Sequence, residues 1–145
     1  MTAIRPLRPE DEPAWRRLWT GYLAFYETEV REAVYRATFT RLLDEEVADM
    51  HGFLALHDGA PVGLVHYLFH SHFWKLEKVT YLQDLYVAPE ARGTGAGRAL
   101  IEAVYAAADA AGAPSVYWTT QHFNQTARTL YDRIGTLTPF VKYQR

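Results

Sequence analysis

The chain has no cysteine and only two methionines among its 145 residues. A disulfide framework, a thiolate zinc site and a cysteine nucleophile are therefore all excluded. The chain also lacks the run of about 20 apolar residues that a membrane-spanning helix needs, and its first residues do not follow the pattern of a secretory signal. These absences predict a soluble cytoplasmic protein that has no membrane partner.

Charge of either sign is not in large excess. Fifteen Lys and Arg side chains against 17 Asp and Glu give a formal net charge of −2. Domains that bind nucleic acid usually concentrate positive charge, so this balance predicts that nucleic acid is not the partner. Apolar residues are plentiful, at 49%, with 14% aromatic. At this length they suffice for one core, and we expect a single domain over residues 1–145.

The stretch from residue 81 to residue 112 combines a strand, a glycine-rich loop and a helix. Tyr81–Val87 has the aromatic and aliphatic content of a strand in a covered sheet. The segment Arg92–Arg98 contains the glycines of the loop. Good helix formers then continue to Ala111, and the next residue, Gly112, ends the predicted helix as its C-terminal cap. Glycines before a helix let backbone N–H groups approach an anion, which the helix dipole also attracts. The stretch predicts a phosphate-binding loop.

The spacing within the loop narrows its type. A P-loop requires Lys and Ser/Thr after its last glycine, where this chain has Arg98 and Ala99, and a dinucleotide fingerprint would need Gly or Ala at position 98. The pattern present is Arg/Gln-x-x-Gly-x-Gly/Ala, which resembles the pyrophosphate loop of the GNAT superfamily of acyl-CoA-dependent N-acetyltransferases. The resemblance implies acetyl-CoA as cosubstrate and a set of loop residues that contact it: Arg92, Gly93, Thr94, Gly95, Ala96, Gly97 and Arg98.

A second motif lies downstream, at Asn124–Tyr131. It resembles the other GNAT signature, Asn-x-x-Ala-x-x-Leu-Tyr. The resemblance implies that Asn124 and Ala127 lie beside the cofactor and that the Tyr131 hydroxyl protonates the departing CoA thiolate. Taken alone, Asn124 would be a helix N-cap and Tyr131 a core aromatic residue.

The likeness extends over nearly the whole chain and is greatest to a bacterial group similar to the yeast histone and polyamine acetyltransferases. The segments that carry it are Trp19–Tyr26, Tyr81–Val87, Tyr117–Thr120 and Phe140–Tyr143. Polyamine acetyltransferases of this kind carry glutamate at the position of Gln83, and glutamine cannot act as a base. Polyamine activity is therefore an open question for this chain.

The GNAT plan also implies a mechanism, in which the amine attacks the thioester directly. Leu85, Tyr86 and Val87 would pair with the pantetheine arm where the strand splays from its neighbour. The protein must then supply a general acid, for which Tyr131 is the candidate, and a route for the proton of the amine. Asp84 is the candidate base, directly or through water, because it is a carboxylate inside a strand that should be buried. The alternative is that Asp84 pairs with an arginine or caps backbone.

Aromatic residues gather on the first helix, and the end of that helix overlies the acceptor site in the GNAT plan. Tyr26, Glu27 and Glu29 could wall a pocket for a cation, with Gln83 opposite, although the two glutamates could equally form a solvated face. We therefore expect a small-molecule or peptide amine as acceptor, with a small cationic amine preferred. His66, His70 and His72 alternate, yet no carboxylate follows at ligand spacing, so no metal is expected.

The remaining pattern predicts a mixed α/β sheet with helices on both faces, in the order β-αα-β-β-β-α-β-α-β. A hairpin signal at Asp58–Ala60 separates two of the strands. The expected strands cover residues 4–8, 52–57, 61–70, 81–87, 115–120 and 138–144, and the expected helices residues 14–25, 34–43, 98–111 and 124–134.

The last expected strand leaves an open apolar edge, and closing it with a second copy predicts a homodimer assembled through the C-terminal region. The alternative is a monomer in which Lys142 and Arg145 keep this short edge soluble. A different class of function also remains open, namely a catalytically silent acyl-CoA-binding sensor or interaction module. Such a module would keep the glycine loop but would not need Tyr131, so the presence of Tyr131 favours an enzyme.

Overall fold

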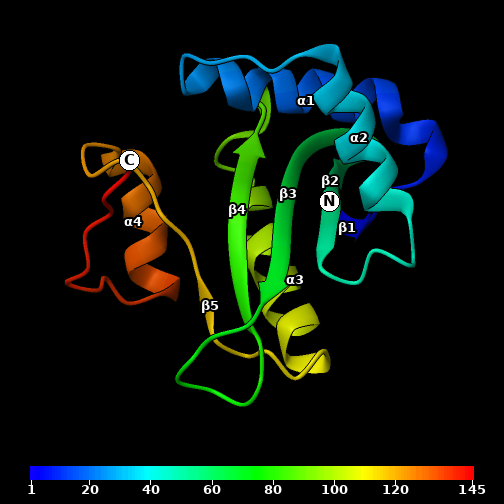
Figure 1. The fold of residues 1–145 in the computed structure, drawn as a ribbon. Helices are drawn as coiled ribbons and strands as arrows, with labels where there is room; N and C mark the ends of the chain where they lie inside the picture. The colour runs from blue at the N-terminus through cyan, green and yellow to red at the C-terminus, as the bar shows by residue number, and fades with distance from the viewer.

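The fold is built on one five-stranded sheet, described here from a computed structural model that covers residues 1–145. The strands follow one another in the order of the sequence (Figure 1). Neighbouring strands are antiparallel from β1 to β4, and β5 lies parallel to β4. The strands are β1 (Thr2–Pro6), β2 (Met50–His57), β3 (Ala60–His70), β4 (Val79–Val87) and β5 (Val116–Tyr117).

Four α-helices accompany the sheet: α1 (Glu12–Phe25), α2 (Glu32–Leu43), α3 (Ala96–Ala110) and α4 (Gln125–Ile134). Two short 3₁₀ turns, Pro9–Asp11 and Pro89–Ala91, precede α1 and α3. The helices α1 and α2 cover one face of the sheet and α3 covers the other, while α4 stands beyond β5 (Figure 1). None of the helices is long and apolar enough to cross a membrane.

Each face of the sheet has its own core. On the α1 side, Trp15 and Leu18 are buried against Leu54 and Leu64 of the sheet. On the α3 side, three residues of the helix, Leu100, Ile101 and Val104, are fully buried and share one core with Ala55 and Val65 of the strands. Strand neighbours 54 and 55, like 64 and 65, thus face opposite cores, as the period of two requires.

A partly buried ion pair fixes the start of α1 to the first strand. The Asp11 carboxylate accepts hydrogen bonds from both Arg5 terminal nitrogens, at 2.7 and 2.9 Å, and from the Arg8 backbone N–H at 2.7 Å. The hydrogen bond from Arg5, aided by that from Arg8, holds the pKa of Asp11 below its usual value. Asp11 is only 6% exposed, and it lines neither of the two cavities described below.

The mixed α/β class predicted from the sequence is confirmed, including the hairpin between β2 and β3. Its turn residues Asp58 and Gly59 both have positive φ, 50° and 84°, as the tight turn of a two-residue hairpin requires. All four helices lie within two residues of their expected starts and within one of their expected ends.

Two expected strands differ from the structure. The strand expected over residues 115–120 pairs only at Val116 and Tyr117, and the strand expected over 138–144 is not formed. Phe140 and Tyr143 are 80% and 93% exposed. Strand preference in a sequence reflects packing on neighbouring strands, and the residues after α4 have no such neighbour within one chain.

Candidate active site

A bulge in β4 shapes the centre of the site. His66 pairs with Asp84 and the next residue of β3, Tyr67, pairs with Leu82, so Gln83 has no partner on β3. In a regular strand Gln83 and Asp84 would point to opposite faces. Here both line the same cavity on the α1 side, while Leu82 belongs to the core on the α3 side. The bulge thus brings two consecutive polar side chains to one place, a common use of bulges beside active sites.

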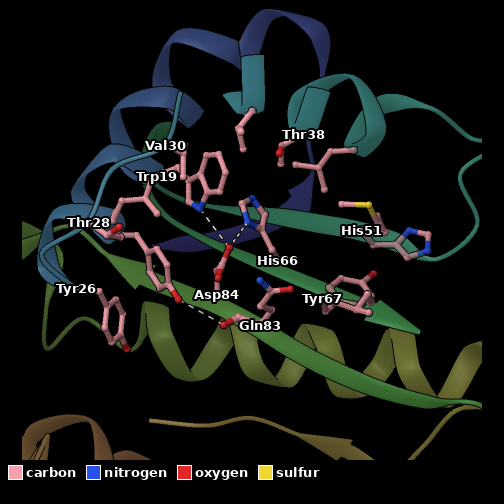
Figure 2. A pocket seen from close by; sticks show the side chains of 16 residues that line it. Trp19, Tyr26, Thr28, Val30, Thr38, His51, His66, Tyr67, Gln83 and Asp84 are labelled. Carbon is pink, nitrogen blue, oxygen red and sulfur yellow. Dashed lines mark hydrogen bonds and ion pairs between the residues drawn. The ribbon is translucent and has the colours of Figure 1, made fainter. Parts of the chain in front are cut away.

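Asp84 lies at the end of a buried hydrogen-bond chain. Its Oδ2 accepts from the Trp19 indole N–H at 3.2 Å and faces His66 Nδ1 at 2.8 Å (Figure 2). The Trp15 indole N–H donates to His66 Nε2 at 2.9 Å. An indole nitrogen only donates, so Nε2 is the acceptor and the imidazole proton resides on Nδ1, from which it is donated to Asp84. Asp84 is 7% exposed.

Aromatic packing holds this chain in place. Trp15 and Trp19 stack at 5.2 Å between ring centroids, and Tyr35 and Phe39 of α2 pack on them at their edges or at a tilt. The sequence prediction offered Asp84 an arginine or backbone partner as the alternative to catalysis. Its actual partners are Trp19 and His66, which the sequence analysis did not connect with it.

The cavity that Asp84 lines has a volume of about 440 Å³ and lies between α1, α2 and the sheet (Figure 2). We call it the acceptor cavity. Of the side chains predicted to bind substrate, Tyr26 and Gln83 line it. Glu27 and Glu29 line neither this cavity nor the one described next, and both are exposed. The wall consists instead of Tyr26, Thr28 and Val30, which alternate with the two glutamates.

A second cavity, of about 630 Å³, lies between β4, the glycine loop and α4. We call it the cofactor cavity. It exists because β4 and β5 part after the pair Tyr81 and Tyr117, so no strand covers β4 on this side from Leu82 to Val87. The residues predicted to contact the cofactor line it with one exception: Leu85, Tyr86, Val87, Arg92, Gly93, Gly95, Ala96, Gly97, Arg98, Asn124, Ala127 and Tyr131.

The exception is Thr94, whose hydroxyl donates to the Ala91 carbonyl at 2.6 Å and steadies the loop. Phe25, Thr126 and Arg133 line the cofactor cavity without having been predicted. Phe25 ends α1, whereas Thr126 and Arg133 lie on α4. Spacing within one helix cannot reveal that residues of two distant helices line one cavity.

The glycine loop leaves open space where the helix begins. Gly93 and Gly95 have φ of 82° and 86°, a region that favours glycine, and a Cβ on either would meet no atom within 4 Å. Gly95 is the residue before α3, whose first N–H groups have no partner within the helix. A phosphate can therefore approach the backbone of this loop and the positive end of α3.

Asn124 and Tyr131 are both placed by α4. The Asn124 side chain accepts from the Ala127 N–H at 3.3 Å, so it caps the helix and lines the cofactor cavity at once. Tyr131 packs edge-on against Trp118 at 5.5 Å. Burial, and secondarily the nearby Tyr26, raises the pKa of Tyr131 to about 12. The phenol therefore keeps its proton throughout the neutral range and can donate it.

The two cavities adjoin, because Tyr22 and Tyr26 line both of them. The Tyr22 hydroxyl donates to the Gln83 backbone carbonyl at 3.5 Å. Burial, together with the Asp84 charge, raises the pKa of Tyr22 above its usual value. A reacting group at this junction would have Asp84 on the acceptor side and Tyr131 on the cofactor side. The arrangement suits a transfer between two molecules that enter from different sides.

Comparison with known proteins agrees with this geometry. The sequence model of the acetyltransferase (GNAT) family matches residues 12–136. The D-amino-acid N-acetyltransferase HPA3 of Saccharomyces cerevisiae is 42% identical over 144 residues, which cover 98% of this chain and 89% of the yeast protein. The uncharacterized N-acetyltransferase YhfO of Bacillus subtilis is 30% identical over 91% of this chain and 87% of its own.

Among solved structures, the aminoglycoside N-acetyltransferase AAC(6')-Iy, in complex with the bisubstrate analogue CoA-S-monomethyl-acetylneamine, has a TM-score of 0.86. The match covers 100% of this chain and 97% of that one at 19% identity, which supports the fold alone. With the family match over most of its length and the 42% identical yeast relative, the chain belongs to the GNAT family of acetyltransferases.

Proposed function

We propose that this protein transfers the acetyl group of acetyl-CoA to a primary amine by direct attack, with Tyr131 as general acid. The observation that carries the proposal is the junction of the two cavities, which has a buried carboxylate on one side and a protonated phenol on the other. An amide-forming transfer needs those two groups, because nitrogen must lose a proton and sulfur must gain one.

The residues of the cofactor cavity fit a CoA thioester. Open space at Gly93 and Gly95, beside the N-terminus of α3, suits the pyrophosphate. The uncovered edge of β4 at Leu85–Val87 suits the amide groups of a pantetheine arm, which would pair with it as a strand does. When bound, acetyl-CoA supplies an acyl group activated as a thioester.

The chain's own residues then manage the protons. The nitrogen attacks as a free amine, so an ammonium group first loses one proton to solvent. Asp84 accepts the proton that the amine then loses as its N–C bond forms, directly or through a water molecule, and releases it to solvent. Tyr131 donates a proton to the sulfur as the C–S bond breaks, and the phenol regains a proton from solvent. Trp19 and His66 hold the Asp84 carboxylate in a fixed position by donating to the same oxygen. Positioning and proton transfer are all that a direct attack requires of the protein.

The acceptor is the finer part of the proposal. The yeast relative is named for D-amino acids, which makes an amino acid one candidate. The predicted likeness to histone and polyamine acetyltransferases makes a lysine-like or polyamine amine another, although Gln83 stands where polyamine enzymes have glutamate. Release of CoA thiol from acetyl-CoA, measured over a panel of amines, tests transfer directly. Binding of acetyl-CoA with no thiol release on any amine would favour a silent acyl-CoA sensor instead.

Acetyl-CoA should raise the melting temperature of the protein by several degrees. A ligand that binds only the folded state adds about 2.7 kcal/mol to the free energy of unfolding at a hundredfold excess over its dissociation constant. In a domain of this size, that stabilisation raises the melting temperature by several degrees. Gly95→Val should remove most of this shift, because its side chain would occupy the open space beside α3. Differential scanning fluorimetry with and without acetyl-CoA measures both effects.

Gly112→Val is the matched control for Gly95→Val. Gly112 also has a positive φ, 71°, and a Cβ there would also meet nothing within 4 Å, but it lies at the opposite end of α3. The two variants should suffer similar backbone strain, and only Gly95→Val should lose the acetyl-CoA shift. An equal shift in both variants, or none in the unaltered protein, would contradict the assignment of the loop.

We also propose that the protein forms a homodimer through its C-terminal region. Apolar side chains of residues 136–145 are exposed, namely Leu137, Phe140, Val141 and Tyr143. The short strand β5 also leaves one edge of the sheet open. Light scattering after size-exclusion chromatography should give twice the 16.6 kDa of one chain. Deletion of residues 138–145 should give the monomer, and a dimer that survives the deletion would place the interface elsewhere.

A further inference from the structure

The acceptor cavity is lined by a single carboxylate, that of Asp84, and by no lysine or arginine. Two histidines, His51 and His66, also line it. His66 accepts a hydrogen bond from Trp15 on Nε2 and so carries a single proton, and His51 is turned toward the Ala48 carbonyl, 2.7 Å from its Nε2. The cavity therefore offers one negative charge and no fixed positive charge.

The other acidic side chains near the cavity do not add to this charge. Glu27 has left-handed backbone, φ 56°, directly after α1, and Tyr26, Thr28 and Val30 line the cavity around it. Glu27 and Glu29 are exposed to solvent. A second ammonium group on the acceptor would thus find no carboxylate inside the cavity.

The remaining wall is largely apolar. Six aliphatic side chains contribute to it: Leu23, Val30, Val34, Leu42, Met50 and Leu68. Aromatic rings close it toward the junction with the cofactor cavity, at Tyr22 and Tyr26. A volume of about 440 Å³ accommodates an aromatic ring or a branched chain, and an apolar body gains free energy by leaving water for such a wall.

We infer that the acceptor is an amine with one positive charge, an apolar body and no carboxylate. The inference rests on the proposed acetyl transfer and specifies its substrate class. The ammonium group approaches Asp84 and the rings of Tyr22 and Tyr26, and the body fills the aliphatic end of the cavity. Within the cavity, a carboxylate on the acceptor would lose water without gaining a cation, and a second ammonium group would lose water without gaining a carboxylate, so both are unfavourable there.

Three amines that share a phenylethyl skeleton test the exclusion of a carboxylate. Phenethylamine has hydrogen where D-phenylalanine has a carboxylate, and D-phenylalaninol has a hydroxymethyl group there. We expect kcat/KM, measured by release of CoA thiol at pH 8.5, to be at least tenfold higher for the two neutral-bodied amines. This pH lies well above the ordinary pKa of a histidine side chain. Equal or greater kcat/KM for D-phenylalanine would overturn the inference.

Hexylamine and 1,6-diaminohexane test the second charge in the same way. They differ only in the far ammonium group, and we expect hexylamine to be preferred at least tenfold. Comparable values would show that a second positive charge is accommodated, and would overturn the single-charge part of the inference.

A charge added to the cavity wall should weaken the preference. Thr38 of α2 lines the acceptor cavity (Figure 2), so Thr38→Lys adds the missing cation, and Thr38→Met adds a side chain of similar length without charge. The ratio of kcat/KM for phenethylamine over D-phenylalanine should fall at least tenfold in Thr38→Lys relative to Thr38→Met. An unchanged ratio would mean that charge inside the cavity does not select the acceptor, against the inference.

A binding measurement separates this inference from the proposed reaction. With CoA present in place of acetyl-CoA no transfer takes place, and the melting temperature then reports occupancy of the acceptor cavity. Phenethylamine should raise it further and D-phenylalanine should not. If that preference holds while no amine releases thiol from acetyl-CoA, the proposed reaction fails and the ligand class stands. If D-phenylalanine gives the larger shift, the ligand class fails whatever the reaction proves to be.

Discussion

Replacing Tyr131 by phenylalanine should lower kcat by about 10², the contribution expected of one general acid, with little change in affinity for acetyl-CoA. The substitution removes only the hydroxyl, so the ring keeps its edge-on contact with Trp118 and its place in the wall of the cofactor cavity. Without the phenol, the thiolate must leave unprotonated or take its proton from water. Steady-state kinetics and titration of acetyl-CoA binding separate the two effects.

The pH dependence of the unaltered protein bears on the same role. An acid works only while protonated, and the pKa of Tyr131 is raised to about 12. Ionisation of Tyr131 should therefore not lower kcat between pH 7 and about pH 10, and should do so only as the pH approaches 12. A fall in kcat that the phenylalanine variant lacks, centred well below pH 10, would be inconsistent with this burial of the phenol.

Tyr105→Phe supplies the matched control. Tyr105 lies on α3 and donates its hydroxyl to the Ile134 carbonyl at 2.7 Å, outside both cavities. Its loss should cost about 1 kcal/mol of stability, as for a typical hydrogen bond, and leave kcat unchanged. A Tyr131→Phe enzyme as active as Tyr105→Phe would assign the acid to water or to another group.

The parts of the site that depend on local chemistry could be predicted from the sequence. The glycine loop and the N-cap at Asn124 each occupy one continuous segment, and their conformations follow from residue type, as the positive φ at Gly93 and Gly95 illustrates. The helices were predicted to within two residues because the apolar face of α3, for example, repeats at helical spacing through Leu100 and Val104.

The parts of the site that depend on strand register could not be predicted from the sequence. The composition of the segment Leu82-Gln83-Asp84 does not predict a bulge. The bulge is nevertheless the reason that Gln83 and Asp84 line the same cavity. The partners of Asp84 lie 65 and 18 positions away in the sequence, at Trp19 and His66, and only the packing of α1 on β3 and β4 unites them. A spacing rule within one element carries no information about such a contact.

The end of α1 shows the same limit. The sequence left two placements open for Glu27 and Glu29, beside Tyr26 in the wall of the acceptor pocket or on a solvated face, and in the structure both are exposed to solvent. The left-handed conformation of Glu27, which ends the helix, turns the chain so that the residues between and after the glutamates face inward. A positive φ at a glutamate is uncommon, and residue type gives no reason to expect it there.

Replacing Asp84 by asparagine should have the second large effect on activity. The surroundings of this buried carboxylate allow its charge to be removed with little disturbance of the structure. Trp19 and His66 donate to a single oxygen of Asp84. In Asp84→Asn the amide oxygen can occupy that position and accept both hydrogen bonds. We therefore expect the variant to fold, with acetyl-CoA raising its melting temperature as in the unaltered protein.

Activity, by contrast, should fall. If Asp84 takes the proton of the amine, directly or through water, Asp84→Asn should lower kcat by about 10² or more, since an amide cannot act as a base. If Asp84 only attracts the ammonium group, KM for the amine should rise while kcat changes little.

Asp11→Asn is the control. Asp11 is as buried as Asp84 and is bonded to Arg5, but it lies outside both cavities, so the Asp11→Asn variant should lose stability and keep its kcat. We expect the loss in kcat for Asp84→Asn, and a value within threefold of the unaltered protein at saturating amine would assign the base to water or to another residue.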